Sequence, residues 1–68
     1  MIVHVNGRAR ELPAEATVER VLADLSLDPA RRGIAVAVDA EVVPRGEWAH
    51  RRLSAGARVE VLSAAQGG

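Results

Sequence analysis

The sequence of 68 residues contains no cysteine and no lysine, and Trp48 is its only aromatic residue. Without cysteine, these residues can form no disulfide and no thiolate metal site, and they offer no thiol nucleophile. Without lysine, they offer no side-chain amine as a Schiff-base nucleophile or as the acceptor of an isopeptide bond. The hydrophobic residues, 49% of the sequence, are mainly Val, Ala, Leu and Ile, so the core must be aliphatic and closely packed.

The formal net charge is zero, because nine basic residues, all of them arginine, balance nine acidic residues. Nucleic acids and anionic membranes attract proteins with a concentrated positive surface, so this balance argues against both as main partners. The first residues lack the basic start and the long apolar stretch of a signal peptide, and no uncharged run approaches the ~20 residues of a membrane span. We therefore expect a cytoplasmic protein with a single small domain.

The first third of the chain predicts a hairpin followed by a helix. Residues 1–5 are rich in β-branched side chains, and Asn6-Gly7 is a strong hairpin signal because both residues tolerate a positive φ. We expect the returning strand at residues 8–12, with its end at Pro13. Thr17 is a candidate N-cap for a helix of about two to three turns. The apolar residues of this helix recur at helical spacing and are Val18, Val21, Leu22 and Leu25.

A loop and a strand are predicted next. The loop is expected at residues 26–33, which contain Asp28-Pro29 and end at Gly33. The strand is expected at residues 34–38, where large and small side chains alternate with the period of a strand. The residues expected to face the core are Ile34, Val36 and Val38, and those expected to face outward are Ala35 and Ala37.

The remaining residues predict two more strands. An Asp39-Ala40 turn should lead into a short strand at residues 41–43, which Pro44 ends. The last strand is expected at residues 58–62. Its core-facing residues should be Val59 and Val61.

The predicted order of elements is hairpin, helix, strand, short strand and strand. This order is typical of an α+β fold in which one helix covers one face of a mixed sheet. The β-grasp, or ubiquitin-like, fold is the most economical solution, with a mixed sheet of about four to five strands and its first and last strands parallel at the centre. We expect a β-grasp domain over residues 1–62 and a flexible C-terminal tail over residues 63–68.

Three segments carry a resemblance to a known family: IAVAVDAEVVPRGEWA at residues 34–49, LSAGARVEVL at residues 53–62, and the final Gly67-Gly68. With these segments the chain resembles the ThiS family, the sulfur carrier proteins of thiamine biosynthesis. The resemblance covers nearly the whole chain, because the first hairpin and the helix fall where that family has them. One departure is Asp39-Ala40, where members of the family often have Asn-Gly. Alanine adopts a positive φ poorly, so the type of this turn is left open.

The resemblance implies a carrier that is not an enzyme and binds no cofactor, with the α-carboxylate of Gly68 as its reactive group. A ubiquitin-activating-type adenylyltransferase (ThiF-like) would use ATP with Mg to convert this carboxylate to an acyl adenylate. Sulfur from a donor such as a cysteine desulfurase or a rhodanese would then replace the AMP. The resulting thiocarboxylate would supply sulfur to a ThiG-like thiazole synthase.

The composition of the tail suits a carboxylate that must enter a narrow ATP site. Glycine at positions 67 and 68 lets the backbone approach the walls closely, and Gln66 and Gly67 would thread into the partner ahead of Gly68. Residues 63–68 carry no charged side chain that a channel would have to desolvate. Fully extended, they reach roughly 20 Å at ~3.3 Å per residue.

A docking surface is predicted on the uncovered face of the sheet. Its candidate residues are Ile2, Ala35, Ala37 and Leu62, which alternation places opposite the core face. The competing interpretation is that scattered exposed apolar residues are normal on a protein surface.

Other residues that could carry chemistry have simpler structural interpretations. His4 and His50 lack a third ligand at metal-like spacing, so we expect them to face solvent or to cap backbone groups. Arg31-Arg32 and Arg51-Arg52 could bind phosphate or an acidic loop, but solvated loop charges are the commoner outcome. Trp48 could anchor an interface, and we expect it instead to pack against the helix or the edge of the sheet.

Three alternative functions remain open at this point. The chain could carry sulfur for another pathway, as the small subunit of molybdopterin synthase or as a carrier of cysteine biosynthesis. It could also be a ubiquitin-like modifier joined through Gly68 to lysines of other proteins. Finally, it could be a β-grasp interaction module whose tail has no chemical role.

Overall fold

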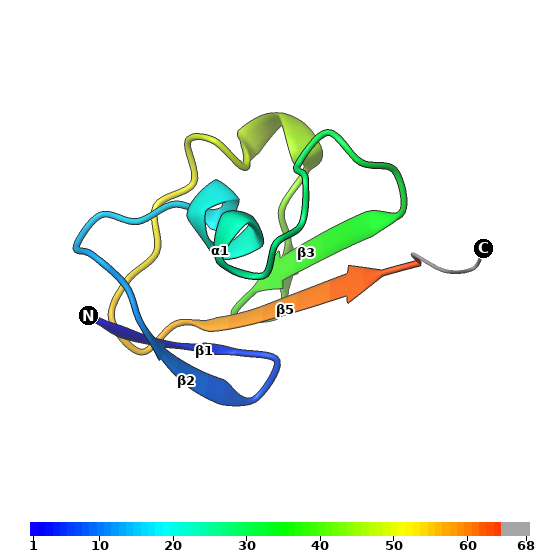
Figure 1. Ribbon diagram of the computed structural model, residues 1–68. Helices are drawn as coiled ribbons and strands as arrows, with labels where there is room; N and C mark the ends of the chain where they lie inside the picture. The colour runs from blue at the N-terminus through cyan, green and yellow to red at the C-terminus, as the bar shows by residue number, and fades with distance from the viewer. Residues whose placement is uncertain (65–68) are drawn as a thin grey trace.

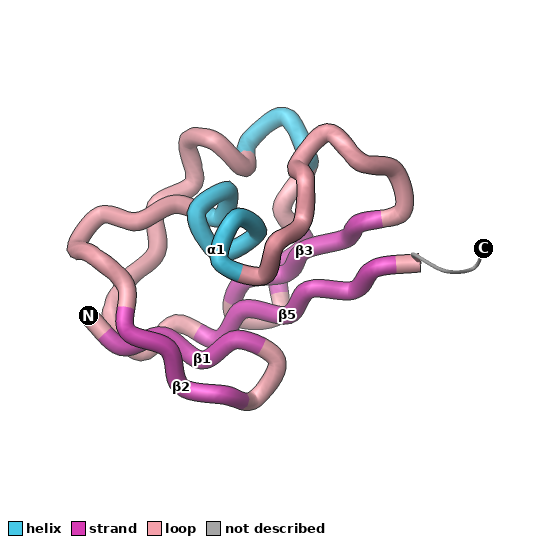
Figure 2. The backbone as a smooth tube through the Cα atoms, viewed as in Figure 1, coloured by secondary structure: helices cyan, strands magenta, loops and turns pink. Residues whose placement is uncertain are grey.

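The computed structural model describes residues 1–64, which form a mixed sheet with one α-helix across one face (Figure 1). The strands are β1 (Ile2–Val5), β2 (Arg8–Glu11), β3 (Ile34–Val38), β4 (Glu41–Val42) and β5 (Arg58–Ser63). The helices are α1 (Val18–Asp24) and the short 3₁₀ helix η1 (Arg45–Glu47). In Figure 2 the helix layer and the sheet layer are separate, and the long connections run on the helix side. None of the helices in residues 1–64 is long and apolar enough to cross a membrane.

The strand order is β2-β1-β5-β3-β4, so the first and last strands are neighbours at the centre of the sheet. They run parallel, with His4 opposite Arg58 and Val5 opposite Val59. All other strand pairs are antiparallel. This arrangement confirms the predicted β-grasp fold.

The core lies between the sheet and α1 and is almost entirely aliphatic. The alternation predicted for β3 and β5 is confirmed, because the residues expected to face inward are buried and Ala35 is exposed. Trp48 is buried, and its Nε1 donates a hydrogen bond to the Val43 carbonyl at 2.9 Å. Its own carbonyl accepts the Glu19 N–H in the first turn of α1 at 3.1 Å. Trp48 therefore packs beneath the start of the helix, as predicted, and its indole nitrogen is satisfied.

Both tight hairpin turns have a positive φ at each central residue, as a type I′ turn requires. The values are 51° and 84° at Asn6 and Gly7, and 50° and 70° at Asp39 and Ala40. The open question about the second turn is therefore answered, because Ala40 adopts the left-handed region. The Asp39 side chain holds this turn in place, since its Oδ1 accepts the Arg58 N–H at 2.9 Å.

Asn6 has a second role that its assignment to a turn did not predict. Its side-chain Oδ1 accepts the Val61 N–H at 2.8 Å, and its Nδ2 donates to the Val61 carbonyl at 3.2 Å. The amide thereby pairs with β5 as a further strand residue would. This holds β5 against the first hairpin beyond the end of β1.

The ends of several elements differ from the predicted ones by a single residue. β2 ends at Glu11 and β4 at Val42, each one residue earlier than expected, whereas β5 continues to Ser63 because Ser63 pairs with Ile34. Thr17 is the N-cap of α1, but its side chain makes no capping hydrogen bond.

Candidate functional site

The candidate site is the point at which the chain leaves the sheet at the end of β5. Here the Ala64 N–H donates a hydrogen bond to the Gly33 carbonyl at 2.8 Å, next to the pair formed by Ile34 and Ser63. Gly33 has a φ of 83°, and a Cβ placed on it would lie 3.3 Å from the Ala64 Cβ. The loop before β3 and the end of β5 are therefore in close contact. The predicted site residues Gln66, Gly67 and Gly68 lie outside the described residues.

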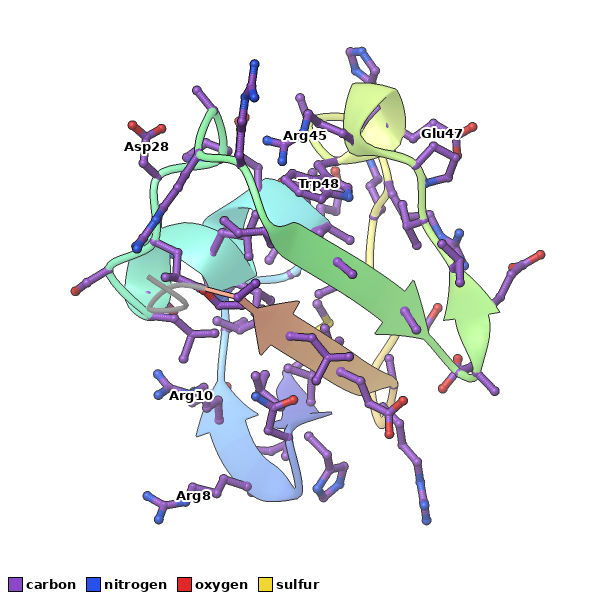
Figure 3. All side chains as sticks on the ribbon, turned by 90° about the vertical axis from the view of Figure 1, so that its right-hand side faces the viewer. Arg8, Arg10, Asp28, Arg45, Glu47 and Trp48 are labelled. Carbon is purple, nitrogen blue, oxygen red and sulfur yellow. The ribbon has the colours of Figure 1, made fainter. Side chains whose placement is uncertain are left out.

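The loop that ends at Gly33 is fastened to η1 by Arg45. The Arg45 guanidinium lies over the Trp48 ring, 4.5 Å from its centroid, and donates hydrogen bonds to the carbonyls of Pro29 and, at 2.6 Å, Arg31. Figure 3 shows Arg45 beside Trp48. We call these contacts the Arg45 clamp. The sequence pattern indicated no role for Arg45. The available signal was the Arg-x-x-Trp spacing, since residues i and i+3 overlie each other in a 3₁₀ turn.

The outward face of the sheet carries an apolar patch beside the end of β5. Ala35 and Leu62 are direct cross-strand partners, and Ala37 is opposite Val42 on the other side of β3. Leu62 is 70% exposed and Val42 is 73% exposed. These residues, Ala35, Ala37, Val42 and Leu62, form what we call the Leu62 patch. Val42 was not among the predicted residues. Val43 is buried, and because neighbouring residues of a strand face opposite sides, Val42 faces outward.

Ile2, the fourth predicted docking residue, lies apart from the Leu62 patch. It is 43% exposed, and its carbonyl accepts the Gly56 N–H at 2.7 Å, just before β5 begins. Because β5 runs from this end of the sheet to Leu62 at about 3.3 Å per residue, the two side chains are separated by roughly 20 Å. The structure therefore brings together Ala35, Ala37 and Leu62 and leaves Ile2 at the opposite end.

The polar residues singled out in the sequence do not form a second site. His4 and His50 are exposed, and within residues 1–64 no three His, Cys, Asp or Glu side chains are grouped to hold a metal ion. Arg51, which is half-buried, and Arg52, which is exposed, form ion pairs at the surface with the exposed Glu41 at 3.6 Å and Glu15 at 3.8 Å respectively. Pairs of this kind contribute little to stability.

The five-stranded sheet, the single crossing helix and the central last strand define a small ubiquitin-like protein of the β-grasp class. Residues 3–68 match the model of the ThiS family, so the chain belongs to that family. The family is one of small sulfur carrier proteins of thiamine biosynthesis and not of enzymes, which confirms the resemblance found in the sequence.

A solved structure supports the same assignment. The crystal structure of a thiamine biosynthesis protein (ThiS) from Geobacter metallireducens is similar to this chain, with 25% sequence identity, 93% of each chain covered and a TM-score of 0.77. The search of curated proteins found no match.

Proposed function

We propose that this chain carries sulfur as a thiocarboxylate on Gly68 and supplies it to a thiazole synthase. The observation that supports this most is the family match, which extends through Gly68. The fold is consistent with it, because the central strand β5 ends beside an exposed apolar patch with four residues still to follow Ala64. These residues could extend roughly 13 Å from the sheet, at ~3.3 Å per residue.

The chemistry divides into two steps at the Gly68 carboxylate. In the first, a carboxylate oxygen attacks the α-phosphorus of ATP in a ThiF-like adenylyltransferase, and pyrophosphate leaves. In the second, the outer sulfur of a persulfide on a desulfurase or a rhodanese attacks the acyl carbon, and AMP leaves. A thiol then reduces the S–S bond of the resulting acyl disulfide, which releases the thiocarboxylate and leaves a disulfide on the donor. The carrier contributes no acid, base or metal to either step in this proposal. Its contribution is to present a carboxylate whose neighbours, Gln66 and Gly67, add no charge.

The Leu62 patch is proposed to dock on the adenylyltransferase. An enzyme that acts on Gly68 must come close to the end of β5, because the segment after Ala64 is short. Leu62 and Val42 are the most exposed large hydrophobic residues among residues 1–64. Burying them against an apolar partner surface would favour binding at about 25 cal/mol per Å² of apolar area.

Adenylation is tested by ATP–pyrophosphate exchange with the chain, Mg²⁺ and a ThiF-like adenylyltransferase. We expect exchange that depends on this chain and is lost when one residue is appended after Gly68. Exchange that continues with the extended chain would contradict a reaction at the Gly68 carboxylate.

The recipient of the sulfur requires a separate measurement. Thiocarboxylated chain incubated with a thiazole synthase and its other substrates should lose its sulfur. Transfer to molybdopterin synthase or to cysteine biosynthesis instead would identify one of the alternative carriers. Covalent conjugates on other proteins would identify a modifier.

A further inference from the structure

We propose that Arg45 and Gly33 are positioning residues that set the direction in which the chain leaves the sheet toward the activating enzyme. This inference rests on the proposed reaction at Gly68. Neither residue is proposed to touch ATP or the reacting carboxylate. Both would act on the reaction through Ala64.

The first step of the argument is that the Arg45 clamp has a rigid base. Trp48 is 3% exposed and is fixed by its hydrogen bond to Val43, so its ring is a stable platform for the guanidinium. The planar guanidinium can donate to two acceptors at once while it stacks on an aromatic ring, which a lysine ammonium cannot do. Through the carbonyls of Pro29 and Arg31, it fixes the loop relative to η1.

The second step is that this loop determines the position of Ala64. Gly33 follows the clamped carbonyls closely and accepts the Ala64 N–H at 2.8 Å. The Asn6 side chain holds β5 at Val61, three residues earlier, so it fixes the strand before this point. The hydrogen bond to Gly33 therefore lies between the anchored strand and the segment that carries Gly68.

The third step concerns distance. Gly68 is four residues beyond Ala64, so the position of Ala64 sets the point from which these residues must reach the reacting centre. A misplacement of about 1 Å at a reacting centre can reduce a rate roughly a hundredfold. Loss of the clamp should therefore lower the turnover of adenylation while the Leu62 patch still docks.

Two glycines provide a matched comparison for Gly33. Gly33 and Gly56 both have a φ of 83°, so replacement by alanine imposes the same left-handed backbone on each. A Cβ on Gly33 meets the Ala64 Cβ at 3.3 Å, whereas a Cβ on Gly56 meets nothing within 4 Å. The difference between Gly33→Ala and Gly56→Ala therefore isolates the contact with Ala64.

The experiment measures kcat and KM for adenylation of each variant by the ThiF-like adenylyltransferase with ATP and Mg²⁺. We expect Arg45→Gln and Gly33→Ala to lower kcat by roughly tenfold with little change in KM, and Arg45→Lys to lie between Arg45→Gln and the unaltered chain. Gly56→Ala and Arg52→Gln, which removes another exposed arginine, should retain the original kcat. Unchanged kcat in both Arg45→Gln and Gly33→Ala would overturn the inference.

Hydrogen exchange of the Ala64 amide, measured by NMR on the chain alone, tests the clamp without any enzyme. Exchange should accelerate in Arg45→Gln and stay unchanged in Arg52→Gln. If Arg45→Gln lowers kcat but leaves Ala64 exchange unchanged, Arg45 contacts the enzyme directly and the inference is wrong. If the unaltered chain is not adenylated at all, the proposed function fails, and Ala64 exchange still decides whether Arg45 positions this residue.

Discussion

Asn6 combines a left-handed turn conformation, with a φ of 51°, and a pair of side-chain hydrogen bonds to Val61. An asparagine is well suited to both, because it tolerates a positive φ and carries a donor and an acceptor like those of a backbone amide. Its sequence context, Asn-Gly between two strands, predicted the turn. The pairing with β5 could not be predicted, because it depends on which strand lies beside the hairpin.

We predict that Asn6→Gly destabilises the fold by about 1–3 kcal/mol. Glycine keeps the positive φ, so the loss comes from the two hydrogen bonds and from the Val61 backbone groups left without partners. Urea unfolding followed by Trp48 fluorescence measures the change, since Trp48 is the only aromatic residue and is buried. An unchanged free energy of unfolding would show that the side-chain pairing contributes nothing to stability.

Ala40 shows where residue preferences and tertiary structure diverge. The sequence predicted a turn at Asp39-Ala40, but alanine's poor tolerance of a positive φ left its type undecided. In the structure the register of Val38 with Glu41 leaves two residues for the connection, and Ala40 has a φ of 70°. The pairing of β3 with β4 thus imposes a conformation that the residue itself disfavours.

At the scale of the elements, alternation in β3 and β5 was sufficient to predict three of the four residues of the Leu62 patch, with Val42 the exception. Ala35 and Leu62 had to face away from the core once Val36 and Val61 faced it, and the central position of β5 made them neighbours. Ile2 was correctly assigned to the same face, but it does not lie beside the other predicted docking residues. The face on which a side chain lies follows from the two-residue period of a strand. Which residues it meets on the neighbouring strand depends on the register, which alternation does not specify.

Leu62 and Ile2 allow a controlled test of the proposed docking surface. Leu62→Ser should raise KM for the carrier in adenylation by roughly tenfold, which corresponds to about 1.4 kcal/mol of lost binding. The side chain is 70% exposed, so the stability of the fold should change little. Ile2→Ser is the control, because Ile2 is exposed on the same face at the other end of the sheet.

Steady-state kinetics at varied carrier concentration separate the two variants. Ile2→Ser should leave KM unchanged. Equal effects of the two substitutions would mean that the enzyme does not recognise the Leu62 patch in particular.

The contact between the Arg45 clamp and the loop is also a property of tertiary structure. The sequence places Arg45 and Trp48 on one turn, yet it does not indicate that Pro29 and Arg31 lie beside that turn. The loop returns across the helix layer and meets η1 there (Figure 1). Contacts between irregular segments follow no period, so sequence patterns could not have predicted this one.

At the scale of the whole molecule, a small aliphatic core supports a central strand, β5, that leads to the residue proposed to react, Gly68. β5 is flanked by β1 on one side and β3 on the other, and further held by Asn6 and Gly33 near its end. Such a small domain has little stability to spare, because it buries only about 60% of the surface of its unfolded chain. The central position of β5 therefore fixes the place at which the chain leaves the sheet.

The central claim is that Gly68 receives sulfur. It is tested most directly by the intact mass of the chain after incubation with ATP, Mg²⁺, a ThiF-like adenylyltransferase and a sulfur donor. We predict the mass increase of one oxygen replaced by sulfur, located at Gly68 by fragmentation and absent when one residue is appended after it. An unchanged mass, under conditions that convert an established carrier to its thiocarboxylate, would contradict the account.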